Sequence, residues 1–146
     1  MKKITIATAI ALALVAAPFE ASAAQKLMTG DAAKKAVEGL TRMNQIEMIE
    51  LFSGNSLPWS SGGAYYAPDG TLEIFWKGKK LTGKWRVNEE GRDCMIVPKW
   101  WKNEEKCVGQ WFFADDGYIG YAKEKKKAHL KLKSEIYEGN QISKYQ

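Results

Sequence analysis

From Tyr65 onward, apolar and polar residues alternate with a period of two, and turn residues interrupt the alternation about every ten residues. In the first such segment, Leu72, Ile74 and Trp76 fall on one face. Similar segments follow as far as Tyr137. Because a period of two sends successive side chains to opposite faces of a strand, the pattern predicts a meander of short antiparallel strands.

Seven or eight such strands can curl, and closure would remove their exposed edges. We therefore predict a mainly β fold, either a small antiparallel up-and-down β-barrel or a strongly curved meander. Glycines at Gly83, Gly109 and Gly120 fall within predicted strands, where a bend or close packing would require them. The segment Ser56–Gly63 precedes the strands and is predicted to be a loop.

One or two short N-terminal helices are expected before the sheet, over one end or one face of it. Residues 31–40 repeat apolar side chains at helical spacing. For a second helix, Asn44 and Glu47 have the spacing of a capping box, and Gly54 can end the helix. Its predicted apolar stripe consists of Ile46, Ile49 and Phe52.

The first 23 residues have the pattern of a secretory signal peptide. A short basic start precedes an apolar run, and small residues lead to a cleavage site after Ala23. The apolar run is shorter than the roughly 20 residues that a membrane-spanning helix needs. We expect residues 24–146 to form one globular domain, helical over 31–53 and a sheet over 64–145. The mature protein is expected in the periplasm or outside the cell, with no transmembrane segment.

The two cysteines, Cys94 and Cys107, are expected to form a disulfide, because export places them in an oxidising compartment. If they face each other across a hairpin, the tip comprises residues 98–103. The alternation then puts both cysteines on the inner face with Ile96 and Trp111. One distant histidine and two cysteines do not make a zinc site, so no metal or other cofactor is expected.

Catalytic residues are scarce. The single histidine, His129, falls on the polar face of a lysine-rich strand, where a surface position is favoured. Adjacent carboxylates occur in predicted turns, as Glu89-Glu90, Glu104-Glu105 and Asp115-Asp116. Glycosidase chemistry needs two carboxyl groups that converge on a cleft, which turn residues exposed to solvent do not supply. The sequence therefore favours a protein that is not an enzyme.

Three tryptophans are candidate ligand contacts. Trp100 and Trp101 lie at the predicted hairpin tip between lysines, and Trp59 lies beside two glycines. Tryptophans at a tip can stack on sugar rings or enter a membrane interface. The alternative is that the tip folds over the mouth of the barrel and plugs it.

Three consecutive lysines, Lys125, Lys126 and Lys127, are predicted to form a turn and are candidate contacts for an anionic ligand. The formal net charge of +5 is compatible with an anionic partner or with solubility alone. Lysines on an exposed strand also prevent edge-to-edge aggregation. Export and the presence of only three arginines argue against nucleic acid as a partner.

The interior of the predicted sheet receives Leu72, Ile74, Trp76 and Trp85 as one wall. An eight-stranded barrel is either filled by side chains or holds one small ligand. Six tryptophans in a chain of 146 residues favour a filled interior.

The order of motifs resembles a bacterial family of small exported proteins known only as a domain of unknown function. The resemblance is carried by the Tyr-x-Pro-Asp-Gly-Thr core at Tyr66–Thr71, the Gly-x-Trp at Gly83–Trp85 and the cysteine pair. It covers roughly Asn44 to Trp111 and implies an envelope location and the β fold. It implies no activity, cofactor or catalytic residue.

Taken together, these features predict an exported, non-enzymatic β-barrel module that binds a component of the cell envelope. The ligand could be a polysaccharide, peptidoglycan, a small apolar molecule or a protein. The alternative is an inhibitor or regulator of an envelope enzyme that acts through the same hairpin. A third hypothesis is an enzyme whose carboxylates converge only in the fold. We expect a monomer.

Overall fold

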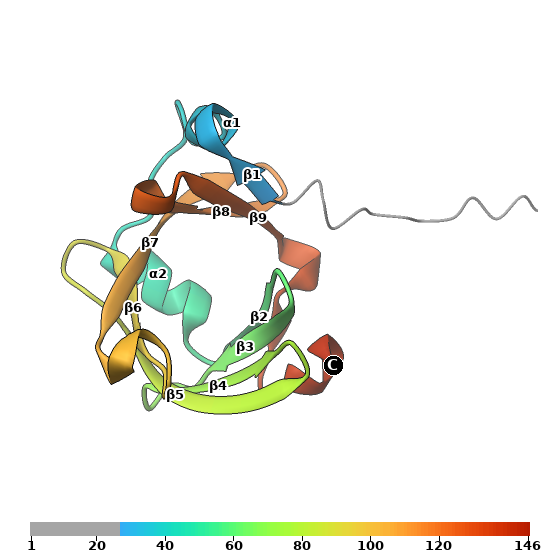
Figure 1. Ribbon diagram of the computed structural model, residues 1–146. Helices are drawn as coiled ribbons and strands as arrows, with labels where there is room; N and C mark the ends of the chain where they lie inside the picture. Colours follow the sequence, from blue (N-terminus) through green and yellow to red (C-terminus); the bar gives the residue numbers. More distant parts are fainter. Residues whose placement is uncertain (1–26) are drawn as a thin grey trace, which may run out of the picture.

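The computed structural model describes residues 27–146, which form one ten-stranded antiparallel sheet and two short α-helices (Figure 1). The predicted signal peptide and its cleavage site after Ala23 lie outside the described residues. The strands follow the order β1-β9-β8-β7-β6-β5-β4-β3-β2-β10. The predicted mainly β fold is confirmed, and of the two alternatives the sheet forms the strongly curved meander. It is not a closed barrel, because its edge strands β1 and β10 do not pair with each other.

The strands in chain order are β1 (Leu27–Thr29), β2 (Asn55–Trp59), β3 (Gly62–Tyr66), β4 (Thr71–Trp76), β5 (Lys79–Val87), β6 (Arg92–Ile96), β7 (Lys106–Ala114), β8 (Gly117–Ala122), β9 (Lys127–Leu132) and β10 (Tyr137–Glu138). The α-helices are α1 (Gly30–Lys35) and α2 (Gln45–Phe52). Short 3-10 helices are η2 (Trp101–Asn103), η3 (Lys123–Lys125), η4 (Lys133–Glu135) and η5 (Ile142–Tyr145).

The curled sheet stays open along a gap between β9 and β2, each of which lies next to an edge strand. We call this gap the seam. Lys131 of β9 donates a hydrogen bond from Nζ to the carbonyl oxygen of Pro58 in β2 across this seam. After β9, the chain crosses to the other side and adds β10 to β2. A side-chain contact and a two-residue strand therefore connect the two margins in place of a full ladder.

Strand β2 corrects the prediction that Ser56–Gly63 is a loop. This segment forms β2 and the start of β3, and Pro58 pairs with Gly63. Proline cannot donate to a ladder, which is why it suggested a loop. In β2 it is tolerated because only Ser56 and Asn55 pair on the other side of the strand. The sheet therefore extends beyond the predicted range 64–145, to β2 and also to β1.

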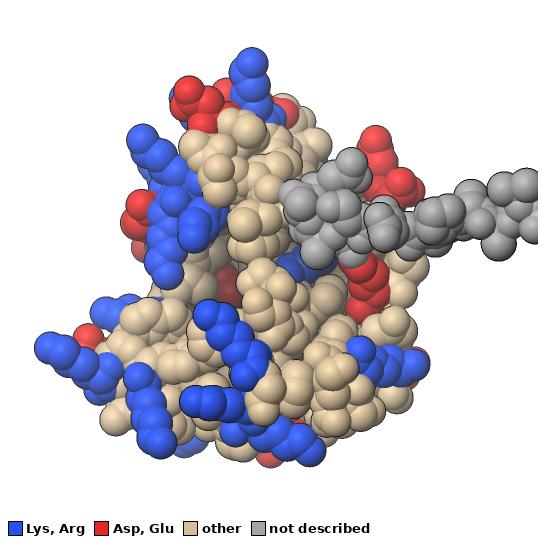
Figure 2. Space-filling view, turned by 45° about the vertical axis from the view of Figure 1, so that its right-hand side comes forward, with Lys and Arg blue, Asp and Glu red and all other residues tan. Residues whose placement is uncertain are grey.

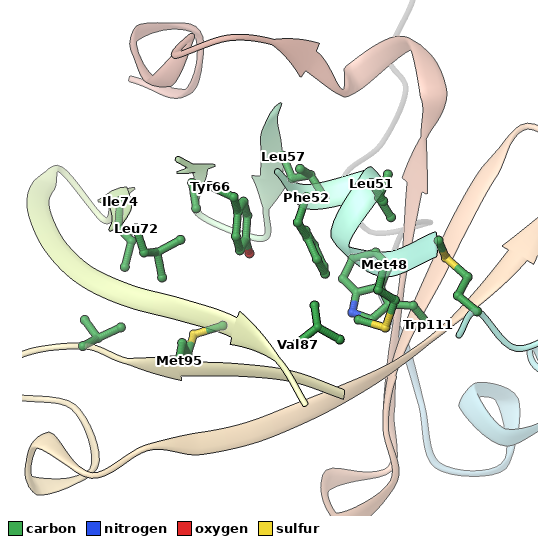
Figure 3. Packing of buried hydrophobic residues seen from close by; sticks show 13 residues of the cluster. Met48, Leu51, Phe52, Leu57, Tyr66, Leu72, Ile74, Val87, Met95 and Trp111 are labelled. Carbon is green, nitrogen blue, oxygen red and sulfur yellow. The ribbon is translucent and has the colours of Figure 1, made fainter. Parts of the chain in front are cut away.

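Helix α2 lies inside the curl of the sheet and fills one end of it (Figures 1 and 3). The predicted capping box is present, and Gly54 ends the segment with φ at +79°. Phe52 is fully buried, but Ile46 and Ile49 are 67% and 41% exposed. The predicted stripe was wrong for these two isoleucines, because the helix instead buries the face that carries Met48, Leu51 and Phe52.

Helix α1 covers the outer face of the sheet over β8 and β9 (Figure 1). Ala33 packs there with Ile119 and Ala128 in a second apolar cluster. The apolar face of β9 is therefore the outer one, and His129 and Lys131 line a cavity on the inner side. The pattern of alternation in β9 was right, but its assignment to inside and outside was reversed because a helix covers the outer face.

The predicted disulfide between Cys94 and Cys107 is confirmed, and the two residues are paired across β6 and β7. Their predicted position on the inner face was wrong. The register shifts between Asp93 and Cys94, so that Val108 lies between two paired residues, Cys107 and Gly109. Regular alternation within β6 sends Asp93 to the interior cavity and Cys94 to a pocket on the outer surface. The β-bulge at Val108 lets Cys107 pair with Cys94 on the outer face, whereas Trp111 of the same strand lines the cavity.

Candidate functional site

A cavity of about 430 Å³ occupies the end of the curled sheet opposite α2. Figure 2 shows a hollow in the surface of this face with lysine and arginine side chains around it. The residues that line the cavity come from the concave side of most strands and from the hairpin between β6 and β7. The interior is thus only partly filled, contrary to the expectation from the six tryptophans.

One side of the cavity is a tryptophan wall, which consists of Trp59, Trp76, Trp100 and Trp101. The ring centroid of Trp100 lies 6.0 Å from that of Trp59, 5.3 Å from that of Trp76 and 5.8 Å from that of Trp101. All four side chains are partly buried. The hairpin tip therefore folds back over the sheet, as the plug alternative requires, and its rings still border open space.

The backbone of this tip has an unusual conformation. Lys99, Trp101, Lys102 and Asn103 all have positive φ, with Trp101 at +45°. Bulky residues rarely adopt this conformation, and such strain persists only where the surroundings fix it. Asn103 Oδ1 accepts a hydrogen bond from the Lys99 amide at 2.8 Å, which holds the turn together. The tip therefore presents its two tryptophans in a defined arrangement.

Opposite the opening lies a polar floor of Tyr66, Asp93 and Trp111. Asp93 is only 7% exposed and Trp111 only 6%. Within the described part of the chain, neither Asp93 Oδ1 nor Trp111 Nε1 has a partner at regular hydrogen-bond geometry, although the Trp111 N–H lies close enough to the Asp93 carboxylate to favour its ionised form. Buried polar atoms are rarely left unpaired in proteins, so an unpaired acceptor and donor at the base of a cavity indicate a place for a ligand group.

Burial raises the pKa of the Asp93 carboxyl, and this effect exceeds the opposing influence of its surroundings. The Trp111 indole N–H, nearby backbone N–H groups and the positive charge of Lys131 favour the ionised form. Carboxyl groups with raised pKa values in clefts are common at functional sites.

The aromatic rings of the polar floor separate the cavity from the core. The Phe52 ring stacks on Tyr66 at 4.6 Å and meets Trp111 edge-on at 5.1 Å (Figure 3). Tyr66 Oη accepts a hydrogen bond from Trp59 Nε1 at 3.3 Å. Burial and the nearby Asp93 raise the pKa of the Tyr66 hydroxyl far above its usual range, so it stays protonated. These rings thus pack with one side in the core and direct polar atoms to the cavity.

Two mid-strand glycines make this arrangement possible. A Cβ atom on Gly109 would lie 2.5 Å from Asp93 Oδ1, and one on Gly120 would lie 3.0 Å from the Trp111 ring. Any larger residue would therefore displace the polar floor. The predicted need for close packing at Gly109 and Gly120 is confirmed.

The lysine rim consists of Lys125 and Lys127, which line the cavity near the turn between β8 and β9. Lys126 belongs to the same turn but does not line the cavity. Deeper in, Lys131 is 8% exposed. His129 is half-buried rather than on the surface, and burial with the nearby lysine charges lowers its pKa. The cavity therefore combines one carboxyl group with several cationic side chains.

Five of the six predicted contact residues line this one cavity, namely Trp59, Trp100, Trp101, Lys125 and Lys127. The sequence analysis did not single out Tyr66, Asp93 or Trp111 as site residues. The feature that could have indicated Asp93 is a charged residue on the same face of the strand as the apolar Met95 and Val97. Alternation gives the two faces of this strand but does not say which of them is inside.

The carboxylate pairs and the residues with metal-ligand spacing lie outside this cavity. The adjacent carboxylates of the three turns are exposed. Among residues 27–146, the cluster with suitable spacing for a metal ion is Cys94, Glu105 and Cys107. Its two sulfur atoms form the disulfide, so they cannot act as thiolate ligands. Within the same residues, no helix is both long and apolar enough to cross a membrane.

Fold and site together define a small antiparallel β protein with an internal, aromatic-lined cavity. The chain belongs to the family described as "Protein of unknown function (DUF995)", whose model matches residues 10–111. The matched region ends at Trp111, so it includes the tryptophan wall and the polar floor but not the lysine rim. No curated protein and no solved structure matched the chain.

Proposed function

We propose that this protein is an exported, non-enzymatic module of the cell envelope that binds a small ligand in its internal cavity. The observation that carries the proposal is the cavity of about 430 Å³, with a tryptophan wall on one side and unpaired polar atoms at its base. Ligand pockets in proteins commonly measure about 300–1,000 Å³ and combine apolar walls with a few convergent polar groups. Export is supported by the signal-peptide pattern of the first 23 residues.

The position of the tryptophans favours a small ligand over a protein partner. Trp100 packs on Trp59 and Trp76, so the hairpin tip directs aromatic area into the cavity. A protein inhibitor acting through this hairpin would instead need that area on the outside. The regulator of an envelope enzyme is therefore the less supported alternative.

An enzymatic function has one observation in its favour, the raised pKa of the buried Asp93 carboxyl in a cavity. Asp93 is the only carboxyl group among the described lining residues. Glycoside hydrolysis by the usual mechanism needs two. Ser60 and His129 also line the cavity, and no hydrogen bond joins them in the described part of the chain. Binding without turnover fits this composition better.

The proposal is tested by native mass spectrometry of the protein from its own exported fraction, followed by tryptophan fluorescence during titration with the extracted small molecules. We expect a bound mass that is lost when Trp59→Ala is combined with Trp100→Ala. Phe113→Ala is the matched control, because this exposed aromatic residue lies outside the cavity. A bare protein mass, together with fluorescence that no extracted fraction alters, would contradict the proposal. Conversion of the bound molecule during incubation would favour the enzyme.

A further inference from the structure

The unpaired atoms of the polar floor point to the chemical group that the cavity receives. The position of a Cβ atom on Gly109 lies 2.5 Å from Asp93 Oδ1 and 3.2 Å from Trp111 Nε1. Both atoms therefore lie beside Gly109, where no side chain covers them. One is a hydrogen-bond acceptor and the other a donor.

A hydroxyl group satisfies both atoms at once, because it can donate to Asp93 and accept from Trp111. An ammonium group would pair with Asp93 but could accept nothing from the Trp111 N–H. It would also meet the positive charge of Lys131, which already acts on Asp93. A carboxylate at this position would repel the Asp93 charge. The polar floor therefore favours a neutral hydroxyl group.

The tryptophan wall adds a second requirement. Four indole rings lie beside the polar floor, and Trp100 is within 6.0 Å of both Trp59 and Trp76 between ring centroids. Indole faces pack well against flat apolar surfaces, including the C–H face of a sugar ring. A pyranose ring carries such a face together with hydroxyl groups around its edge, so it matches the wall and the floor at the same time.

The lysine rim adds the third requirement. Lys125 and Lys127 are exposed at the cavity, on the turn between β8 and β9. Their charges favour a ligand whose outer end is anionic. Lys126, between them in sequence, does not line the cavity and so provides an internal comparison.

We propose that the ligand is an anionic saccharide. Its sugar ring packs against the tryptophan wall, one hydroxyl group bridges Asp93 and Trp111, and its acidic group meets Lys125 and Lys127. This inference rests on the proposed function, because it names the class of ligand for the same cavity.

The test uses three probes that differ in one property each. Cellobiouronic acid supplies hydroxyl groups and a carboxylate, cellobiose supplies the same rings without the charge, and cyclohexanecarboxylate supplies a ring and a charge without hydroxyl groups. Dissociation constants are measured by NMR titration of the indole N–H signals, with the Trp111 signal assigned through Trp111→Phe. We expect the acid to bind about tenfold or more tightly than either other probe. The Trp111 signal should move with both saccharides.

Variants separate the contributions of floor and rim. Asp93→Asn should weaken both saccharides by about tenfold, because the charged acceptor is lost. Lys125→Gln combined with Lys127→Gln should abolish the preference for the acid over cellobiose, whereas Lys126→Gln should leave it unchanged. Circular dichroism of each variant checks that it is folded.

Several results would overturn the inference. Equal affinity for cellobiose and the acid would remove the role of the rim, and equal affinity for cyclohexanecarboxylate would remove the role of the hydroxyl group. A failure of both saccharides to shift any tryptophan signal would also overturn it. If the extracted small molecules still bind in that case, the cavity is a binding site for another class of ligand and the proposed function stands. If the extracted small molecules do not bind either, both the proposed function and the saccharide inference are contradicted.

Discussion

The two ends of the curled sheet use the same kind of side chain in different ways. At the α2 end, Phe52 is fully buried, where its ring stacks on Tyr66 and meets Trp111 edge-on (Figure 3). At the other end, the tryptophan wall stays partly exposed around a cavity. A helix occupies the interior at the first end, and nothing from the described chain occupies it at the second. Aromatic residues alone therefore do not distinguish a core from a binding site, whereas unpaired polar atoms beside them do.

The largest effect is expected at the α2 end. Phe52→Ala should lower the free energy of unfolding by about 4 kcal/mol, because it leaves a cavity among rings that cannot close around it. Urea denaturation measures the loss. Phe113→Ala, at a ring that is 37% exposed, is the control and should cost less than about 1 kcal/mol. Similar losses for the two variants would contradict the assignment of Phe52 to the core.

The disulfide should have the next largest effect, and it acts at the base of the tryptophan hairpin. Replacing Cys94 and Cys107 together by serine should lower the free energy of unfolding by about 3 kcal/mol in the chain-entropy model. Near-ultraviolet circular dichroism should show the signal of the tryptophan wall weakening at lower denaturant concentration than the far-ultraviolet signal of the sheet. Simultaneous loss of both signals would mean that the two ends unfold as one unit.

At the polar floor we expect a substitution to raise the free energy of unfolding and not to lower it. Asp93→Asn should raise the free energy of unfolding at neutral pH by about 1–2 kcal/mol, because it removes a buried charge that lacks full hydrogen bonding. The pKa of Asp93 is raised in the folded protein, so stability should fall as pH rises above the ordinary value of 3.8 and through the raised pKa.

Asp93→Asn should lack this decline, whereas His129, whose pKa is lowered by burial, titrates in both proteins. Thermal denaturation across the acidic to neutral range measures the difference between the two curves. Parallel curves would show that the Asp93 carboxyl carries no penalty, and the contrast between the two ends would then be weaker.

The smallest change in stability is expected at the tryptophan wall. Trp100→Ala should lower the free energy of unfolding by about 1 kcal/mol, because the ring is partly exposed and loses mainly its aromatic contacts. The near-ultraviolet spectrum should nevertheless change strongly, since Trp100 contacts three other indole rings. A loss as large as that of Phe52→Ala would place Trp100 in the core and not in a binding site.

Features that depend on local chemistry could be predicted from the sequence. The capping box of α2, the turn glycine Gly54 and the alternation along the strands each follow from a few neighbouring residues. The disulfide followed from the signal-peptide pattern and an even number of cysteines. The curved meander then followed from the number and spacing of the strands.

Features that depend on what covers each face could not be predicted. In β9, Ala128 is buried on the outer side under α1, so the lysines point to the cavity. Period-two alternation gives two faces but does not say which one is inside. The same ambiguity applies to Asp93 in β6, and in β7 the bulge at Val108 also places Cys107 and Trp111 on opposite faces despite their even spacing.

The order of the strands has a consequence for how the cavity forms in time. Each strand from β2 to β8 pairs with the next strand in the chain, so most of the sheet can grow by successive hairpins with short loop closures. The pairings of β1 with β9 and of β10 with β2 join distant segments, and the contact of Lys131 with Pro58 does the same. The cavity is bordered by Trp59 near the start of this series and Lys131 near its end. It therefore acquires its shape only in the last stage of folding, and occupancy of the cavity reports that the whole chain has assembled.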